Sequence, residues 1–397
     1  MFVTLKVTKL RVHGNRMGRA QKIKNRIKNS SFFGMSYLTG TLILVKLLQL
    51  FIKPNEKQIL FISYSGRQYS DTPKEAYNML RTDPDFADYE LVWAFNKPKL
   101  YKQPELGRKI SSNSPTFFFH LLKSKYWIAN SSIDRLIPFK HEQHVYIQFW
   151  HGVPLKSLGH SEVGLSRLVQ YWYDHVQFDF MFTYSDYDLE KFKAVFPRTK
   201  QFVTQGQLRK NIVQRYEQNI TPARIKYQLG IKSDKPVLLY LPTFRGYDAK
   251  EQTNLTEATL NELSETYTVI YRGHYFTDGA GKGQIITAKN YSLYKMFMIA
   301  DTLITDFSSV FFDFVEYGKK VYLFQPDVSE YIVRRGIYLD AKKDLHLPVA
   351  YSEVELIALM QADNYDYQVL KKIKEEYNPH EGDEAANALK KILMQYL

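Results

Sequence analysis

The chain contains no cysteine in its 397 residues. This absence excludes a disulfide framework, a thiolate metal site and a cysteine nucleophile, and it fits a reducing cytoplasm. Three glycine-rich signatures are also missing: the G-x-x-x-x-G-K-[ST] phosphate loop, the G-x-G-x-x-G dinucleotide fingerprint and the G-x-S-x-G nucleophile elbow. The sequence therefore argues against a P-loop ATPase, a dinucleotide-binding enzyme and an α/β-hydrolase.

Acidic side chains are absent from residues 1–53, which carry eleven Lys and Arg. The rest of the chain carries 43 basic and 41 acidic side chains, so it is almost neutral although the whole chain has a net charge of +13. The excess positive charge is therefore confined to one N-terminal arm. We expect no nucleic-acid partner, because the body is not a generally basic surface.

A long uninterrupted apolar run is also missing. The arm ends in SYLTGTLILVKLLQLFI (residues 36–52), where Gly40, Lys46 and Gln49 interrupt the apolar side chains. The remaining run is shorter than the ~20 residues that a spanning helix needs, and no small-residue cleavage site follows it. We expect an amphipathic helix on an anionic membrane face. A helix packed on the protein's own core and a transmembrane anchor are the alternatives.

Strand-like and helix-like segments alternate from Lys57 onward. Buried strand patterns lie at 58–65, 89–95 and 145–150, and residues 114–130 have the pattern of a helix followed by a strand. A second series of strands lies at 236–244, 267–275, 300–307 and 319–326. Continuous apolar strands separated by helices are typical of parallel sheets. We predict an α/β protein with two Rossmann-like, doubly wound domains that face a cleft, residues 54–220 and 221–397, joined near residues 215–225.

Polar side chains follow three strands of the second series. LITDFSS (303–309) ends a strand and opens a helix, so Ser308 and Ser309 are predicted to bind an anion at the helix N-terminus; simple helix capping is the alternative. YLPTFRG (240–246) brings Thr243 and Arg245 to a strand end, and YRGHYF (271–276) brings Arg272 and His274. Taken alone, each of these side chains is more typical of a structural or solvated residue than of one that binds a ligand. Together, at one sheet edge, they favour a phosphate site.

His151 follows the last strand of the first series, in FWHGVPLKSLG (149–159). It would face the phosphate wall across the cleft and take a proton from an acceptor hydroxyl, while that wall stabilises charge on the leaving group. A buried histidine in a packed loop is the alternative. The pattern suits phosphoryl or glycosyl transfer.

These motifs, in this order and spacing, resemble the CDP-glycerol:glycerophosphate glycerophosphotransferases of wall teichoic acid synthesis. SGRQYSDTPKEAYNML, DYELVWAF and KYWIAN in the first half and RRGIYLD (334–340) in the second add to the resemblance, which runs from about residue 57 to 390. It implies a GT-B architecture and the transfer of a polyol phosphate from a CDP-activated donor to a hydroxyl on a lipid-linked acceptor.

The resemblance also implies roles for individual residues. His151 would be the base and His274 would stabilise the phosphate, while Lys156 would meet acceptor phosphates. The donor wall would comprise Thr243, Arg245, Arg272, Asp306, Ser308, Ser309 and Asp313. We expect no metal site and no cofactor, because CDP-glycerol would be a substrate; a divalent cation is compatible with the sequence but not indicated by it. We expect the protein on the cytoplasmic face of the cell membrane.

Some positions depart from the family pattern. GQLRKN (206–211) stands where Gly-x-Pro-Arg-Asn-Asp is common, so Asn211 replaces an acidic residue and puts its role in doubt. The chain lacks the long N-terminal extension of several polymerising members, which favours a priming or short-chain transferase. A ribitol donor, a nucleotide-sugar glycosyltransferase and a membrane scaffold without chemistry are the alternative functions. The sequence decides neither the number of units added nor the oligomeric state.

Overall fold

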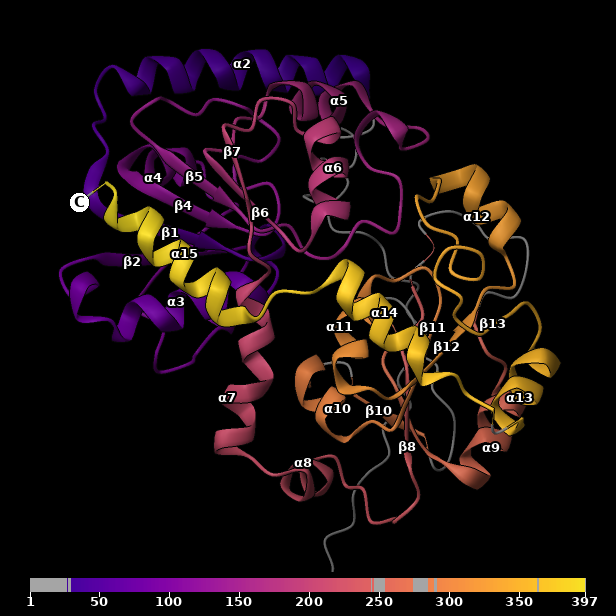
Figure 1. Cartoon of the computed structure of the whole chain (residues 1–397). Coiled ribbons are helices and arrows are strands. Elements are labelled where there is room, and N and C mark those ends of the chain that lie inside the picture. The colour runs from indigo at the N-terminus through magenta and orange to yellow at the C-terminus, as the bar shows by residue number, and fades with distance from the viewer. Residues whose placement is uncertain are drawn as a thin grey trace, which may run out of the picture.

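The computed structural model describes residues 27, 30–243, 245, 254–273, 285–288, 291–362 and 364–396. Within these residues the chain forms two parallel β-sheets, each covered by helices on both faces (Figure 1). This confirms the predicted α/β fold with two Rossmann-like units. The first unit is the part of the chain built on the seven-stranded sheet, and the second unit is the part built on the six-stranded sheet.

The sheet of the first unit has the strand order β3-β2-β1-β4-β5-β6-β7. Its strands are β1 (Asn55–Ile62), β2 (Glu90–Phe95), β3 (Arg108–Ser111), β4 (Ser124–Ala129), β5 (Val145–Gln148), β6 (Phe180–Thr183) and β7 (Gln201–Thr204). The helices α2 (Ser31–Gln49), α4 (Phe117–Lys123), α5 (Arg167–His175) and α6 (Asp186–Val195) contribute to the apolar core on one face. The helices α3 (Asp71–Thr82) and α15 (Gly382–Met394) contribute to the core on the other face.

The sheet of the second unit has the strand order β10-β9-β8-β11-β12-β13. Its strands are β8 (Val237–Tyr240), β9 (Thr268–Tyr271), β10 (Ile286–Thr287), β11 (Thr302–Thr305), β12 (Lys320–Phe324) and β13 (Val349–Ala350). One face packs on α8 (Pro222–Gln228), α10 (Leu293–Ile299), α11 (Val310–Phe314) and α14 (Tyr367–Tyr377). The other face packs on α9 (Glu257–Thr266) and α13 (Glu353–Gln361). Arg335, the last residue of α12 (Val328–Arg335), pairs with Glu162 of the first unit.

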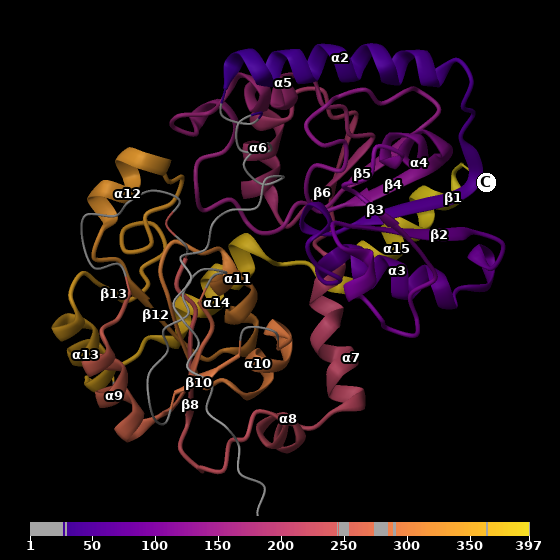
Figure 2. The same ribbon diagram turned by 180° about the vertical axis from the view of Figure 1, so that it is seen from behind.

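Two connections join the units. The first runs through α7 (Asn211–Asn219) into α8. The second follows α14 and leads back to α15, which lies across the first unit (Figure 2). Lys210 ties the two connections together, because its ammonium donates to the carbonyl oxygens of Asn378 and His380 at 3.1 and 2.6 Å. Residues 382–394, which the sequence analysis placed in the second domain, therefore pack in the first unit.

The apolar segment of the arm forms α2, whose N-cap is Ser30. Leu38 and Val45 are buried in the core of the first unit, and Gly34 allows α2 to approach Leu168 of α5 closely. Within the described residues α2 is the one helix long and apolar enough to cross a membrane, by length and composition alone. Residues 1–26, 28 and 29, which hold most of the arm's basic side chains, lie outside the described residues.

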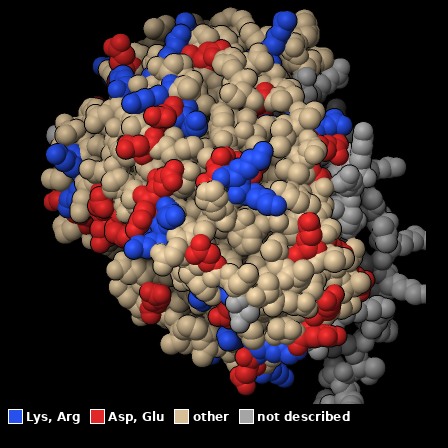
Figure 3. All heavy atoms as spheres, turned by 45° about the vertical axis from the view of Figure 1, so that its right-hand side comes forward, with Lys and Arg blue, Asp and Glu red and all other residues tan. Residues whose placement is uncertain are grey.

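Charged side chains of both signs are interspersed on the face of the molecule in Figure 3, with no broad field of one sign. This agrees with the nearly balanced charge of the chain beyond residue 53.

Candidate active site

A cavity of about 870 Å³ lies between the two units, where the carboxyl ends of their strands face each other. Ligands of doubly wound sheets bind at this edge. The cavity brings together seven of the residues singled out from the sequence: His151, Lys156, Thr243, Arg272, Ser308, Ser309 and Asp313. The motifs of the two halves therefore converge on one site.

His151 follows β5 on a loop that approaches the second unit closely. A Cβ atom at Gly152 would lie 2.4 Å from Ser309 Oγ, so glycine is needed at this position. The imidazole Nδ1 lies 2.8 Å from the carbonyl oxygen of Asn130. Because a carbonyl only accepts, Nδ1 carries the proton, and Nε2 is left as the basic nitrogen.

The protonation state of His151 also suits a base. Its ring is accessible within the cavity, although protein walls surround it on both sides. Desolvation between these walls lowers the pKa of His151 below its usual 6.5, and no carboxylate receives a hydrogen bond from the ring in the described structure. The imidazole is therefore neutral at physiological pH, as proton abstraction requires.

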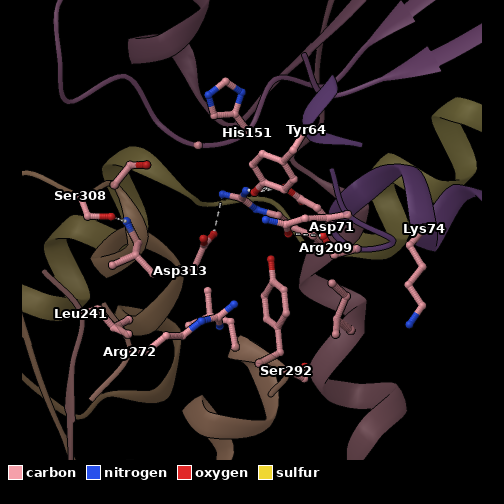
Figure 4. A pocket seen from close by; sticks show the side chains of 18 of the residues that line it. Tyr64, Asp71, Lys74, His151, Arg209, Leu241, Arg272, Ser292, Ser308 and Asp313 are labelled. Atoms are coloured by element: carbon pink, nitrogen blue, oxygen red, sulfur yellow. Dashed lines mark hydrogen bonds and ion pairs between the residues drawn. The ribbon is translucent and has the colours of Figure 1, made fainter. Parts of the chain in front are cut away.

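A hydrogen-bond network lies beneath His151 (Figure 4). Asp71 Oδ2 accepts from the Tyr64 hydroxyl at 2.7 Å and from Asn130 Nδ2 at 2.9 Å. Asn130 thus links Asp71 to the carbonyl that orients His151. Tyr64, Asp71 and Trp150 all have positive φ angles of 47°, 63° and 54°. Such strain in non-glycine residues costs of order 1–3 kcal/mol each and clusters at functional sites.

Arg209 joins the two walls of the cavity. Its guanidinium is buried, with Nη1 3.5 Å from Asp71 of the first unit and Nη2 2.8 Å from Asp313 of the second. Desolvation raises the pKa of Asp313 to about 6, although the charge of Arg209 opposes this shift. Sequence reasoning missed Tyr64, Asp71 and Arg209 as site residues. Asp71 and Arg209 lie in the motifs SGRQYSD and GQLRKN, which served only for comparison with the family pattern, and Tyr64 stands directly before the first of these motifs.

Asn211 is the position in GQLRKN that departs from the family pattern by replacing an acidic residue. Asn211 Nδ2 donates to Asp383 Oδ1 at 2.8 Å, which connects the start of α7 to α15. The residue therefore contributes to the junction between the two connections.

Behind the donor wall lies a buried cluster of charges. Arg245 pairs with Asp327 through Nε and Nη2 at 2.6 and 2.8 Å, and with Asp306 through Nη1 at 2.8 Å. The Asp306 carboxylate also accepts from the backbone N–H of Thr243 at 3.0 Å. Arg245, expected to bind phosphate, is not among the residues that line the cavity. It supports the wall instead, together with Asp306.

Hydroxyl groups form the front of this wall. Thr243 Oγ1 is buried and has no hydrogen-bond partner among the described residues. Ser308 Oγ accepts from the backbone N–H of Val310 at 3.3 Å, and its own hydroxyl proton can still be donated. The N-cap of α11 is Ser309, whose side chain makes no capping hydrogen bond. The helix after Ser309 is short: α11 covers five residues before a 3₁₀ turn that ends at Gly318. We therefore expect the hydroxyls and cations of this wall to contribute more to anion binding than the dipole of so short a helix.

The lining of the cavity carries more positive than negative charge. Its acidic side chains are Asp71, Glu75 and Asp313, and its basic side chains are Arg67, Lys74, Lys156, Arg209 and Arg272. The Arg272 side chain lies in the cavity between the donor wall and α10 (Figure 4). His274 lies outside the described residues, two positions beyond Arg272. Among the described residues no group of three or more His, Asp and Glu side chains is arranged to hold a metal ion.

Two doubly wound units with a cationic cavity at their facing strand ends define the GT-B class of group-transfer enzymes. Within this class the chain belongs to the CDP-Glycerol:Poly(glycerophosphate) glycerophosphotransferase family, whose model matches residues 44–395. This confirms the resemblance that the sequence motifs carry.

Individual relatives agree with this assignment. The chain is 30% identical over 341 residues to a teichoic acid poly(glycerol phosphate) polymerase of Bacillus spizizenii, covering 78% of this chain and 85% of the relative. It is 29% identical over 379 residues to a polymerase of the same name from Bacillus subtilis, covering 89% of this chain but only 50% of the relative. The solved structure of the wall teichoic acid polymerase TagF superposes with a TM-score of 0.74 at 22% identity, covering 92% of this chain and 97% of the other, and shows the same fold.

Proposed function

We propose that this protein transfers glycerol phosphate from CDP-glycerol to a hydroxyl of a lipid-linked teichoic acid acceptor and releases CMP. The observation that carries the proposal is the orientation of His151. Its Nε2 is the basic nitrogen, because Nδ1 donates to the Asn130 carbonyl, and the ring lines the same cavity as Thr243 and Arg272. Family membership supports the choice of donor.

The reaction follows from the two walls. His151 Nε2 removes the proton of the acceptor hydroxyl as its oxygen attacks the phosphorus that bears glycerol. The bond from this phosphorus to the bridging oxygen breaks, and CMP leaves with the electron pair. Donors from Thr243, Ser308, Ser309 and Arg272 stabilise the charge that develops on the phosphates. His274, by its position in the family motif, is proposed to assist at the transferred phosphate.

The proposal is tested by CMP release with CDP-glycerol, CDP-ribitol and UDP-sugars, each offered with a lipid-linked disaccharide acceptor. We expect CMP only with CDP-glycerol, and a product whose mass grows by whole glycerol phosphate units. The mass also counts the units added. UMP or UDP release from UDP-sugars would favour a glycosyltransferase, CMP from CDP-ribitol would favour the ribitol enzyme, and no release from any donor would contradict the proposal.

We also propose that α2 holds the protein on the cytoplasmic face of the membrane. One face of α2 packs on the first unit, and the side chains that point away from it are largely apolar. Phe32, Ile43, Leu44 and Leu47 of α2, with Leu50 and Phe51 directly after it, are between 52% and 83% exposed. An apolar stripe beside a basic segment supports attachment in the plane of the membrane by burial and by attraction to anionic lipid.

Sedimentation with anionic vesicles tests this attachment. Deleting residues 1–53 would remove Leu38 and Val45 from the core, so paired substitutions on the exposed face are preferable. Leu44→Glu with Leu47→Glu should release most of the protein from the vesicles while its thermal midpoint stays unchanged. Val354→Glu, at a position 81% exposed on α13, is the matched control and should still sediment. Full sedimentation of the double variant would contradict attachment through α2.

A further inference from the structure

The segment that follows His151 leaves the first unit and pairs with the second. Lys156 and Ile337 form an antiparallel bridge, Tyr338 N donates to the Leu155 carbonyl at 2.8 Å, and Ser157 N donates to the Gly336 carbonyl at 3.2 Å. These contacts join two motifs, PLKSLG and RRGIYLD, that are about 180 residues apart in the chain. Residues 155–157 are therefore held by the second unit.

Side-chain packing fixes this junction. Gly336 has a φ of 72°, and a Cβ there would lie 2.4 Å from Ser157 Oγ, so only glycine lets the two backbones come this close. Val153 and Leu155 are buried in an apolar cluster with side chains of the second unit. The position of Lys156 is thus determined by the donor wall, although its sequence neighbours carry the base His151.

The ammonium of Lys156 has no hydrogen bond and no ion pair with any described residue, and it lies 5.8 Å from the centre of the Tyr331 ring. Neighbouring cations are neutralised: Arg245 by Asp306 and Asp327, and Arg335 by Glu162 at 2.7 Å. Lys156 lines the cavity together with Thr243 and Ser308. A lysine held in such a place is a point charge available to a phosphate.

We propose that Lys156 binds the donor's pyrophosphate from the first unit, so that the donor site is completed by the same loop that carries the base. This inference rests on the proposed function and differs from the sequence expectation that Lys156 meets acceptor phosphates. It makes Lys156 a ligand of the leaving CMP. It also couples donor binding to the placement of His151, because only four residues lie between His151 and Lys156 in the chain.

The electrostatic surroundings agree with this role. Desolvation is the largest influence and lowers the pKa of Lys156 to about 8; Arg335 and Arg245 act in the same direction, and Asp306 opposes them. An anionic phosphate beside the ammonium would raise the pKa again and hold the proton.

Calorimetry without acceptor tests the proposal, using CDP-glycerol, CMP and cytidine as probes. Lys156→Met should weaken the binding of CDP-glycerol and CMP by about 10- to 100-fold, the range for losing a charge-assisted hydrogen bond. Cytidine has no phosphate and should bind equally to both proteins. Lys156→Arg should restore CDP-glycerol affinity to within a few-fold, and Lys193→Met, at an exposed lysine of α6, should leave it unchanged.

Several outcomes would overturn the proposal. Unchanged CDP-glycerol affinity in Lys156→Met, with a raised KM for the acceptor, would return Lys156 to the acceptor site. Equal loss for cytidine and CDP-glycerol, with a lowered thermal midpoint, would assign a structural role. A wild type that binds CDP-glycerol no better than Lys156→Met contradicts this inference alone. A wild type that binds no CDP-glycerol contradicts the proposed function and the inference with it.

A pH series adds a second readout. Wild-type affinity for CDP-glycerol should fall as the pH rises above 8 and the ammonium loses its proton, whereas Lys156→Arg should show a smaller fall. The other charged and titratable groups that face Lys156 are the same in both proteins: Asp306, Arg245, Arg335, Glu162 and Tyr331. Identical pH profiles would contradict the proposal.

Discussion

The two walls of the cavity are built in different ways. The wall of the first unit presents one basic nitrogen, that of His151, and braces it with strained backbone and a chain of hydrogen bonds through Asn130 to Asp71. The wall of the second unit presents several weak donors in front of a buried charge cluster around Arg245. The difference matches two tasks. Proton transfer needs one group in one orientation, whereas a pyrophosphate is held by the sum of many contacts.

Among substitutions in the two walls, we expect the largest effect at His151. His151→Ala should lower kcat by about 10²- to 10⁴-fold, because no other basic group in the described cavity is oriented in this way. CMP release by the purified variant measures the effect, and His160→Ala, at an exposed histidine in the same segment, is the matched control. Near-normal turnover by a folded His151→Ala variant would contradict the assignment.

In the second wall, we expect substitutions in the buried charge cluster to lower the stability of the fold rather than to remove a reacting group. Arg245→Met removes the guanidinium that neutralises the buried carboxylates of Asp306 and Asp327, which should lower the free energy of unfolding by about 3–5 kcal/mol. Urea denaturation measures this loss. Lys371→Met removes an exposed i,i+4 pair with Glu375 and should cost no more than about 1 kcal/mol. Equal stability of the two variants would show that the cluster does not support the wall.

The hydroxyls in front of the cluster should show smaller effects. Ser308→Ala with Ser309→Ala should weaken CDP-glycerol binding by about 1–3 kcal/mol, since each hydrogen bond contributes about 0.5–1.5 kcal/mol. Calorimetry measures the change, and Ser329→Ala, at an exposed position of α12, should have no effect. Unchanged affinity in the double variant would assign donor binding to the cations alone.

The smallest expected effect is a displacement of the pH profile. The base is active when neutral, and desolvation lowers the pKa of His151. Activity should therefore persist as the pH falls to 6.5 and decline only below it. The pH dependence of kcat/KM in the wild-type enzyme measures this decline at acidic pH. A decline that begins above pH 7 would indicate that the pKa of His151 is not lowered, which would contradict this prediction.

Local patterns predicted much of this molecule. The apolar strands of both series appear in the structure. Seven of the residues singled out after them line one cavity, because the carboxyl ends of parallel strands meet at one edge. Five of the described strands were not predicted: β3, β6 and β7, which cover four residues each, and β10 and β13, which cover two. Such short segments carry too little pattern.

These local patterns could not predict contacts between residues that lie far apart in the chain. Nothing near Arg209 in the sequence indicates that it pairs with both Asp71 and Asp313. Likewise, no local feature of Arg245 distinguishes an arginine that binds phosphate from one that two carboxylates occupy. Such roles depend on which side chains the fold brings together.

The return of α15 to the first unit has a consequence for how the protein is made. Leu389 and Leu393 fill the face of the first sheet that α3 leaves uncovered. During synthesis this face stays bare until the whole second unit has been translated. The half that is translated first is therefore completed last, and a polypeptide released before α15 would expose apolar surface to aggregation.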